Sequence, residues 1–457
     1  MKRYPGRLLA VVTVSLFLAS PALSQEASNE ITVRLFANSR PSSVSIVPSK
    51  GEAMLYARLD QDGIMTVLPG DTITVRPDAL GLSVRAGDMD IHQTELHVRV
   101  SGDDGLVVGI AENGRSTIRR YPGTISIRKS AEQVLAITNT VQIEPYVASV
   151  VAKEYSLGDK EGTRAMAVLA RTLAVRSILD SRQELVDGVG AQVYHGLDVV
   201  TEASREAANS TRGIVLMHKD EPVVAAYSAS NGGHSARNSD VWSGESLPYL
   251  RARKDRFDRA ASPYNDWLSR LSRERVHGAL SQFTGASVTG LSVDSRSKDG
   301  RARTVKLKLQ GAPDAELTGT EFRQVLTGRF GVSALRSTMF DVRTEDGNYV
   351  FEGSGFGHGV GLSQWGAHEM AERGYNFEEI LHFYFAGTRT RSMDKLGFET
   401  GDQVAAVTPP TDDDDPSPRS TRRPRNGERG TTGGLRGWSA SVGAPGTSSS
   451  DRDRVGW

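Results

Sequence analysis

Residues 144–179 read EPYVASVVAKEYSLGDKEGTRAMAVLARTLAVRSIL, and they predict two helices joined by a short turn. In the first helix, Val147, Val150 and Val151 recur at helical spacing and define one apolar face. The next position of that face is Glu154, so a carboxylate stands where the pattern calls for another apolar side chain. This exception makes Glu154 the first candidate for a functional residue.

Two interpretations of Glu154 are open from the sequence. If the helix frays or ends early, the carboxylate lies in water near a helix terminus, since Glu is rarely buried. If it projects from the apolar face into a cleft, partial desolvation raises its pKa, which suits a general acid near neutral pH. Arg171, at the edge of the buried stripe of the second helix, would lower that pKa by direct contact. We therefore expect Arg171 to bind a substrate carboxylate or the charge that develops during a reaction.

Local signals also predict where helices begin and end. Pro145 suits a first helical turn, where its missing N–H costs nothing. Gly158 is expected to end the first helix and Thr163 to cap the second. Thr320 is expected to cap a later helix that contains GTEFRQVL.

Length and composition bound the possible functions. The 457 residues are enough for two or three domains with a sizeable core. Lys plus Arg and Asp plus Glu each number 55, and this balance predicts no general attraction to nucleic acid. The chain has no cysteine, which excludes a disulfide framework, a Cys nucleophile and thiolate metal sites.

The N-terminus has the form of a targeting sequence. Basic residues precede an apolar run over residues 8–19, and small residues suitable for cleavage end at Ser24. The run is shorter than the roughly 20 residues that a membrane span needs. We predict a signal peptide over residues 1–24 and an exported, periplasmic or extracellular chain without a transmembrane segment. An uncleaved anchor is the alternative.

The rest of the chain predicts an α+β protein in three parts. Residues 25–120 contain short runs with alternating apolar residues, separated by turn signals, and predict a β-rich region. Residues 121–396 predict a mixed α/β core around the two-helix element. Residues 397–457 are poor in apolar residues, with segregated charge, and predict a disordered tail.

Two further segments suggest a binding cleft. One is the turn Asn231-Gly232-Gly233-His234, expected to follow a strand formed by VVAAYSAS (223–230). The other is GSGFGHGVGLSQ (353–364), where alternate glycines allow another backbone or a glycan to lie close. The turn as an ordinary loop and His358 as a packed core residue are the structural alternatives. The candidate ligand-binding residues are Ser230, Asn231, Gly232, Gly233, His234, His358 and Gln364.

Taken together, three segments resemble the stage II sporulation protein D family, SpoIID, which includes the amidase-enhancer LytB proteins. The first contains YVASVVAKEYS and AMAVLARTLAVRS, and the second contains QVYHG, TRGIVL and YSASNGGHSA. The third contains GSGFGHGVGLSQWGAHEMAERGYNFEEILHFYFAGT. In family order they extend over roughly residues 120–395.

The resemblance implies a periplasmic or extracytoplasmic lytic transglycosylase that acts on peptidoglycan glycan strands, especially strands without stem peptides. It carries the family's catalytic Glu over to Glu154 and the Arg of its A-R-T segment to Arg171. Some family members are treated only as modifiers of amidases. A non-catalytic wall-binding protein that recruits an amidase is therefore the second expectation.

The sequence departs from the common family pattern in several places. Ala152 replaces a usual Pro, Tyr155 stands where Met is frequent, and Met166 replaces a Gln. The loop from Glu154 to Arg171 is one residue shorter than is common. These departures concern loop geometry and substrate binding more than the identity of Glu154.

Metal binding is not expected. Some family members hold zinc with Cys and His, but this chain has no Cys, and the two imidazoles of His195 and His234 make an incomplete set of ligands. We predict no metal and no other cofactor.

The expected reaction cleaves the bond between N-acetylmuramic acid and N-acetylglucosamine and closes a 1,6-anhydro ring. An Asp198 or Glu202 close to Glu154 would instead favour hydrolysis by water.

Overall fold

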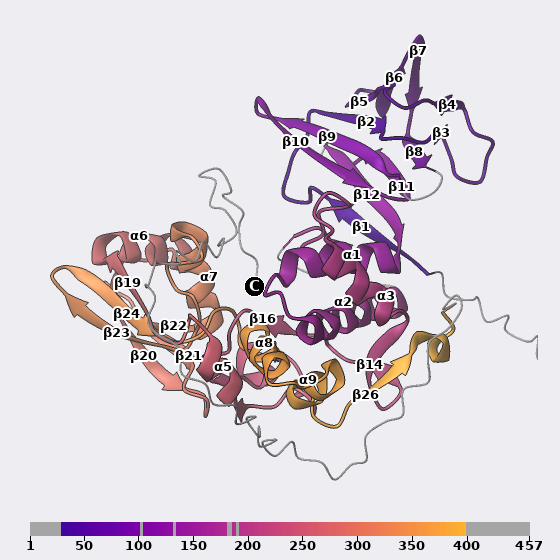
Figure 1. Cartoon of the computed structure of the whole chain (residues 1–457). Helices are drawn as coiled ribbons and strands as arrows, with labels where there is room; N and C mark the ends of the chain where they lie inside the picture. The colour runs from indigo at the N-terminus through magenta and orange to yellow at the C-terminus, as the bar shows by residue number, and fades with distance from the viewer. Residues whose placement is uncertain (1–28, 101–103, 131–133, 181–184, 189–191, 399–457) are drawn as a thin grey trace, which may run out of the picture.

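The computed structural model describes residues 29–100, 104–130, 134–180, 185–188 and 192–398 (Figure 1). The predicted signal peptide and residues 399–457 of the predicted tail lie outside these described residues. Phe398 is buried in the core, so the folded part continues past the predicted boundary at residue 396. Within the described part, no helix is long and apolar enough to cross a membrane.

Two sheets form the N-terminal lobe, as the β-rich prediction requires. In strand order they are β13-β1-β12-β11-β8-β3-β4 and β10-β9-β2-β5-β6-β7. The alternation in the sequence sets their faces: Val44 and Ile46 in β2 are fully buried, while Ser45 between them is partly exposed. The strands are β1 (Glu30–Leu35), β2 (Ser43–Pro48), β3 (Ala53–Tyr56), β4 (Met65–Val67), β5 (Ile73–Pro77), β6 (Leu82–Ala86), β7 (Met89–Gln93), β8 (Glu95–Val100), β9 (Leu106–Glu112), β10 (Arg115–Tyr121), β11 (Thr124–Lys129), β12 (Leu135–Gln142) and β13 (Leu185–Val186).

The predicted two-helix element lies at the centre of the molecule. Strand β12 runs directly into α1 (Ile143–Glu154), which packs against α2 (Lys160–Asp180) and α3 (Glu202–Ser210). The apolar face of α1 is buried in a hydrophobic cluster that is continuous with the N-terminal sheets. The lobe and the helices therefore share one core.

The predicted helix ends are partly wrong. Helix α1 ends at Glu154, before Gly158, which adopts a positive φ of 91° in the connection. Thr163 lies inside α2, and the carboxylate of Asp159 accepts the Gly162 N–H at 2.6 Å, as an N-terminal cap does. Thr320 is also inside its helix, because Thr318 caps it. At the N-termini of α2 and α7, a nearby residue with an equally suitable side chain takes the cap.

Short strands and two helices from the C-terminal part close the central core. Strand β14 (Ile214–His218) lies between β15 (Glu221–Pro222) and β26 (Arg389–Ser392). Helix α2 also contacts α8 (Gln364–Glu372) and α9 (Phe377–Tyr384). The predicted strand over residues 223–230 is reduced to β16 (Tyr227–Ser228), which pairs in parallel with β25 (Leu362–Ser363). The other short elements are α4 (Asn238–Val241), α5 (Arg256–Ala261), β17 (His234–Ser235), β18 (Arg253–Lys254) and the 3-10 helix η1 (Met393–Leu396).

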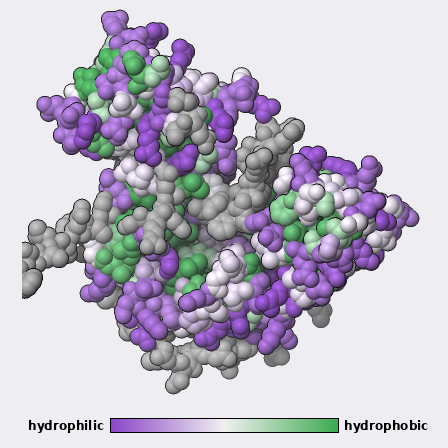
Figure 2. Space-filling model, turned by 180° about the vertical axis from the view of Figure 1, so that it is seen from behind, coloured by the Kyte–Doolittle hydropathy of each residue, from purple (hydrophilic) through white to green (hydrophobic). Residues whose placement is uncertain are grey.

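A second hydrophobic core lies in a separate lobe built from residues 267–351. Two three-stranded sheets, β19-β24-β23 and β20-β21-β22, pack with α6 and α7 around Phe322, Phe340 and Phe351. Seen from behind, this lobe and the N-terminal lobe both carry hydrophobic patches among polar side chains (Figure 2). The bounds are β19 (Trp267–Ser272), α6 (Arg273–Thr284), β20 (Val288–Arg296), β21 (Ala302–Leu309), β22 (Ala315–Thr318), α7 (Gly319–Phe330), β23 (Phe340–Glu345) and β24 (Asn348–Gly353).

Candidate functional site

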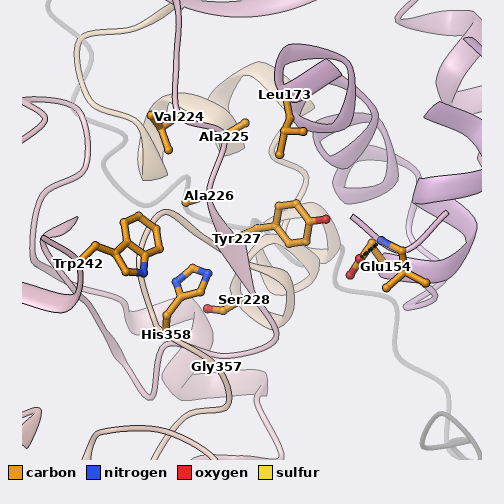
Figure 3. A pocket seen from close by; sticks show the side chains of 11 residues that line it. Glu154, Leu173, Val224, Ala225, Ala226, Tyr227, Ser228, Trp242, Gly357 and His358 are labelled. Atoms are coloured by element: carbon orange, nitrogen blue, oxygen red, sulfur yellow. Dashed lines mark hydrogen bonds between the residues drawn. The ribbon is translucent and has the colours of Figure 1, made fainter. Parts of the chain in front are cut away.

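A cavity of about 360 Å³ lies where the end of α1, the segment around β16 and the glycine-rich segment meet. This volume is near the lower end of the range for small-molecule sites, about 300–1,000 Å³. Glu154 lies at one end of the view and Trp242 with His358 at the other, with Tyr227 between them (Figure 3). The lining residues are Glu154, Leu173, Val193, Val224, Ala225, Ala226, Tyr227, Ser228, Trp242, Gly357 and His358.

Glu154 is the last residue of α1, and its half-buried carboxyl lines the cavity. Oε1 accepts the Val193 N–H at 2.8 Å. The Glu154 backbone carbonyl accepts a hydrogen bond from Gln364 Nε2 at 2.8 Å, which fixes the helix end. Burial raises the pKa of the carboxyl, and the Val193 N–H, Tyr227 and Lys153 oppose that effect. The structure thus places Glu154 in a cleft, the second of the two interpretations.

Tyr227 is a candidate that the sequence interpretation missed. Its side chain extends from β16 with the hydroxyl toward Glu154 (Figure 3). This hydroxyl is buried and lowers the pKa of Glu154, although the two groups do not meet the geometry of a hydrogen bond. The nearby Gln192 Nε2 also lacks a hydrogen-bond partner among the described residues. Buried polar groups are rarely left unsatisfied, so the hydroxyl of Tyr227, which lines the cavity, is suited to contact a ligand.

Trp242 and His358 form an aromatic wall of the cavity. Their ring centroids lie 5.0 Å apart with the planes at 60°. Burial and the positive charges of Arg323 and Arg301 lower the pKa of His358 to about 3. Its Nδ1 accepts the Val360 N–H at 3.0 Å, so the ring is neutral at pH 7 with its proton on Nε2. His358 therefore suits packing against a ligand and does not suit proton transfer near neutral pH.

Arg171 is not in this cavity, which differs from the expectation. Its guanidinium has no exposed surface and forms a bidentate ion pair with Glu144, with Nε–Oε1 at 3.0 Å and Nη2–Oε2 at 2.7 Å. The remaining N–H groups donate to Ala208 O, Thr211 Oγ1 and Ile214 O. All five donors are used within the protein, so none is free for a substrate. Arg171 joins α2 to α1, α3 and β14.

The turn predicted to bind ligand is also mostly internal. Ser230 and Asn231 are buried and bond to the carboxylates of Asp258 in α5 and of Asp255, which caps the N-terminus of α5. Ser230 Oγ donates to Asp258 Oδ2 at 3.0 Å, and Asn231 Nδ2 donates to Asp255 Oδ2 at 2.7 Å. The N–H of Gly233 also donates to Asp258 Oδ2, at 2.8 Å. These groups hold the turn against α5, because two buried carboxylates need several donors to offset their desolvation.

The other predicted ligand residues have varied positions. Gly232 has a positive φ of 72° and packs against the backbone around Ser354. His234 Nδ1 contacts the carbonyl oxygen of Ser235 at 3.0 Å and is not part of the cavity lining. The Gln364 side chain contacts the backbone carbonyl of Glu154 and does not line the cavity. Of the predicted ligand residues, the structure brings His358 alone into the cavity with Glu154.

The alternating glycines allow close contact with other parts of the protein. Gly355, Gly357, Gly359 and Gly361 all have positive φ values, between 71° and 109°. A Cβ at Gly359 would collide with the Arg301 guanidinium, and one at Gly361 would collide with the Ala226 carbonyl. The sequence left open whether another part of the protein or a glycan lies against these glycines, and in the structure it is the protein. This close packing gives His358 a rigid support.

Of the described residues that line the cavity, Glu154 alone carries a carboxylate. Asp198 is bonded to the backbone N–H and Nε of Arg120, and Glu202 is paired with Arg205 on the surface of α3. Neither lines the cavity. No group of three or more His, Asp or Glu side chains is placed to bind a metal ion within the described ranges.

Comparison with known proteins gives two family matches and several relatives. A model described as Stage II sporulation protein (SpoIID) matches residues 131–218, and one described as a domain of unknown function (DUF8618) matches residues 256–361. Stage II sporulation protein D of Bacillus subtilis is 25% identical over 303 residues, which cover 62% of this chain and 83% of that protein. The family model and this relative support the resemblance to the SpoIID/LytB family.

Two other relatives extend the comparison. The amidase enhancer of Bacillus subtilis is 27% identical over 277 residues, covering 51% of this chain and 38% of that protein. An uncharacterized protein of Brachyspira hyodysenteriae is 28% identical over 368 residues, covering 79% of this chain and 92% of that protein.

The candidate site draws on both matched parts of the chain. Glu154, Leu173 and Val193 come from the SpoIID match, whereas Gly357 and His358 come from the DUF8618 match. The segment that contains Tyr227 and Trp242 lies between the two matches. The SpoIID match alone therefore supplies the carboxyl group but only one side of the cavity.

Proposed function

We propose that this chain is an exported peptidoglycan lytic transglycosylase with Glu154 as its general acid and base. The observation that carries the proposal is a single half-buried carboxyl with a raised pKa in a cavity that has an aromatic wall. The substrate is a glycan strand of alternating N-acetylglucosamine and N-acetylmuramic acid. The family resemblance supplies the substrate class, and the chemistry of the cavity is suited to it.

In the proposed reaction, protonated Glu154 donates its proton to the oxygen of the β-1,4 bond between N-acetylmuramic acid and N-acetylglucosamine. The bond from C1 to that oxygen breaks as positive charge develops on the muramoyl ring. The Glu154 carboxylate then removes the proton from the C6 hydroxyl, whose oxygen bonds to C1. The products are a 1,6-anhydromuramoyl end and a new N-acetylglucosamine end, and Glu154 regains its proton.

This route needs only one carboxyl group because the nucleophile belongs to the substrate. Glycosidases that use water or an enzyme nucleophile place two carboxyl groups across the bond, about 5–10 Å apart. Asp198 and Glu202 are held elsewhere by their own partners, which favours the one-carboxyl reaction. The raised pKa supports the first step, since more of the acid is protonated near neutral pH.

The neighbouring groups have separate roles in this proposal. The Tyr227 hydroxyl, which has no hydrogen-bond partner within the described part of the chain, contacts either the Glu154 carboxylate or a sugar hydroxyl when the strand is bound. Trp242 and His358 pack against the less polar face of a sugar ring. Arg171 acts as a positioning residue, because its ion pair with Glu144 fixes α1 against α2.

The test is mass spectrometry of purified, peptide-free glycan strands after incubation with the mature chain. We expect 1,6-anhydro ends from the wild type and from the matched control Glu202→Gln, whose carboxylate is exposed on α3. Glu154→Gln should give at least 100-fold fewer ends, since positioned acid–base groups contribute about 10²–10⁴-fold. Reducing ends without anhydro ends would identify a hydrolase and contradict the proposal.

A second candidate function rests on the relationship to an amidase enhancer. In that case the chain binds the wall and recruits or stimulates an amidase, and the cavity serves for binding alone. Glu154→Gln would then retain stimulation of the amidase. If neither the wild type nor Glu154→Gln produces anhydro ends and both still bind glycan, this second function is favoured.

A further inference from the structure

Arg301 is almost completely buried although it stands at the tip of a hairpin. It belongs to the turn between β20 and β21 in the lobe of residues 267–351, and such turns normally lie on the surface. Only 2% of its surface is accessible, and its Nε lies 2.9 Å from Oδ2 of the buried Asp299. Its Nη2 donates to the carbonyl oxygens of Asn231 at 2.7 Å and His234 at 3.1 Å. The side chain therefore extends out of its own lobe and bonds to the turn over residues 231–234.

The Arg301 guanidinium also packs against the glycine-rich segment that carries His358. A Cβ at Gly359 would collide with this guanidinium, so the missing side chain allows the two groups to meet. The Gly359 carbonyl accepts the Ala236 N–H at 2.8 Å, which joins the glycine-rich segment to the residues that follow the turn. Together with burial and Arg323, the charge of Arg301 lowers the pKa of His358, as a nearby cation does. Arg301 thus connects the turn, the glycine-rich segment and its own lobe.

Two other contacts from the same lobe reach the aromatic wall of the cavity. Thr320 Oγ1, on α7, donates to the carbonyl oxygen of Val241 at 3.1 Å, and Val241 directly precedes Trp242. The carbonyl of Arg336 accepts the Gly357 N–H at 2.9 Å, and His358 is the next residue. The backbone beside each ring of the wall is therefore held by the lobe.

The opposite end of the cavity is built without this lobe. The Glu154 carboxyl accepts the Val193 N–H, and its backbone carbonyl accepts from Gln364, and both partners lie outside residues 267–351. None of the described residues that line the cavity belongs to the lobe. Glu154 lies far along the view from Trp242 and His358, with Tyr227 between them (Figure 3). A change in the lobe can therefore displace the wall and leave the carboxyl in place.

We propose that Arg301 is a positioning residue, through which the lobe of residues 267–351 places Trp242 and His358 for contact with a sugar ring. This inference rests on the proposed function, which supplies the sugar. It gives a role to residues that lie within the matched domain of unknown function. The lobe sets the affinity for the strand and takes no part in proton transfer. Loss of Arg301 should therefore raise KM and leave kcat nearly unchanged, as expected for a contact made equally in the ground and transition states.

The experiment combines steady-state cleavage of peptide-free glycan strands with calorimetric binding of the same strands to chains that carry Glu154→Gln. Arg301→Met should raise KM and Kd about 3- to 10-fold, the value of one aromatic contact, and change kcat less than about twofold. Arg343→Met is the matched control, because it removes exposed ion pairs with Glu345 and Glu352 in the same lobe and should change neither constant. Circular dichroism identifies a temperature at which every variant is folded.

Thr320→Val keeps the test available if Arg301→Met does not fold. It removes one hydrogen bond to the backbone beside Trp242 and preserves the shape of the side chain. We expect KM and Kd to rise about 2- to 5-fold, within the usual contribution of a single hydrogen bond. In the control Thr289→Val, the lost bond joins β20 to the carbonyl of Lys308 inside the lobe, and neither constant should change.

The outcomes separate this inference from the proposed function. Wild-type KM and Kd in folded Arg301→Met would overturn the positioning role and leave the proposed function standing. A fall in kcat at unchanged KM would also overturn it, since the lobe would then act on the reaction at Glu154. If the wild type binds glycan and produces no anhydro ends, the proposed function fails, and a higher Kd for Arg301→Met still supports the inference. No binding of glycan by the wild type would overturn both.

Discussion

Replacing Arg171 with methionine distinguishes a positioning role from direct contact with substrate. The guanidinium is fully buried, and its five N–H groups all have protein partners. Methionine keeps much of the side-chain length and removes the charge and the donors. Glu144, whose side chain is 11% exposed, would then keep only the Gly213 N–H as a hydrogen-bond donor among the described residues.

The expected loss of stability is large. Removing one partner of a buried ion pair typically costs about 3–5 kcal/mol, since the other charge is left uncompensated. Typical folded proteins have about 5–15 kcal/mol in total, so this loss is a large fraction. The double variant Arg171→Met/Glu144→Met should recover part of it, with a coupling energy of about 1–3 kcal/mol in the double-mutant cycle. Arg176→Met, with a half-buried ion pair on the same helix, should cost about 1 kcal/mol.

The assay is urea unfolding followed by circular dichroism, together with the yield of anhydro ends per folded molecule. A positioning role predicts a lower unfolding midpoint for Arg171→Met and substantial activity in the double variant at a temperature where it is folded. The reasoning would be refuted by an Arg171→Met protein that has wild-type stability and no cleavage activity. That result would mean that the guanidinium acts on substrate.

Two further predictions concern the cavity and its support. Burial raises the pKa of Glu154 in the folded chain above its value of about 4.3 in the unfolded chain. Protonation of Glu154 therefore stabilises the folded state. This contribution is complete below the unfolded pKa and is lost as the pH rises through the folded pKa. Glu154→Gln should therefore be more stable than wild type at neutral pH, with the difference vanishing in acid; a constant difference in urea midpoint across the pH series would contradict this. Gly359→Ala should lose at least about 1 kcal/mol more stability than Gly374→Ala, because both have positive φ but only Gly359 faces the Arg301 guanidinium, and overpacking a filled site costs about 1–3 kcal/mol. Equal unfolding midpoints for these two variants would show that Arg301 moves aside freely.

The sequence predicted well those features that depend on local periodicity. The two central helices and the β-rich lobe follow from apolar spacing within single segments, and Glu154 was conspicuous because it interrupts such a spacing. Helix caps were less predictable, since Asp159 and Thr318 compete with nearby Thr163 and Thr320 for the same role.

The site was predicted less completely because the identity of a polar residue does not show which group its side chain contacts. Arg171 and Asn231 were both interpreted as ligand-binding groups, yet their partners Glu144 and Asp255 lie 27 and 24 positions away in the sequence. A buried partner and a bound ligand require the same side-chain chemistry. Tyr227 was missed for the opposite reason, since a tyrosine in an apolar strand usually belongs to the core. That its buried hydroxyl has no hydrogen-bond partner among the described residues is seen only in three dimensions.

The pairing of β14 with β26 has a consequence for the order in which the protein folds. Met217 pairs with Arg389, so one edge of β14 stays open until nearly the whole described chain has been synthesised. A fragment that stops before β26 exposes that edge to other polypeptides, which favours aggregation. Pairing over such a long sequence separation also slows folding. This delay suits a polypeptide that must stay unfolded until it has crossed a membrane, as the proposed export requires.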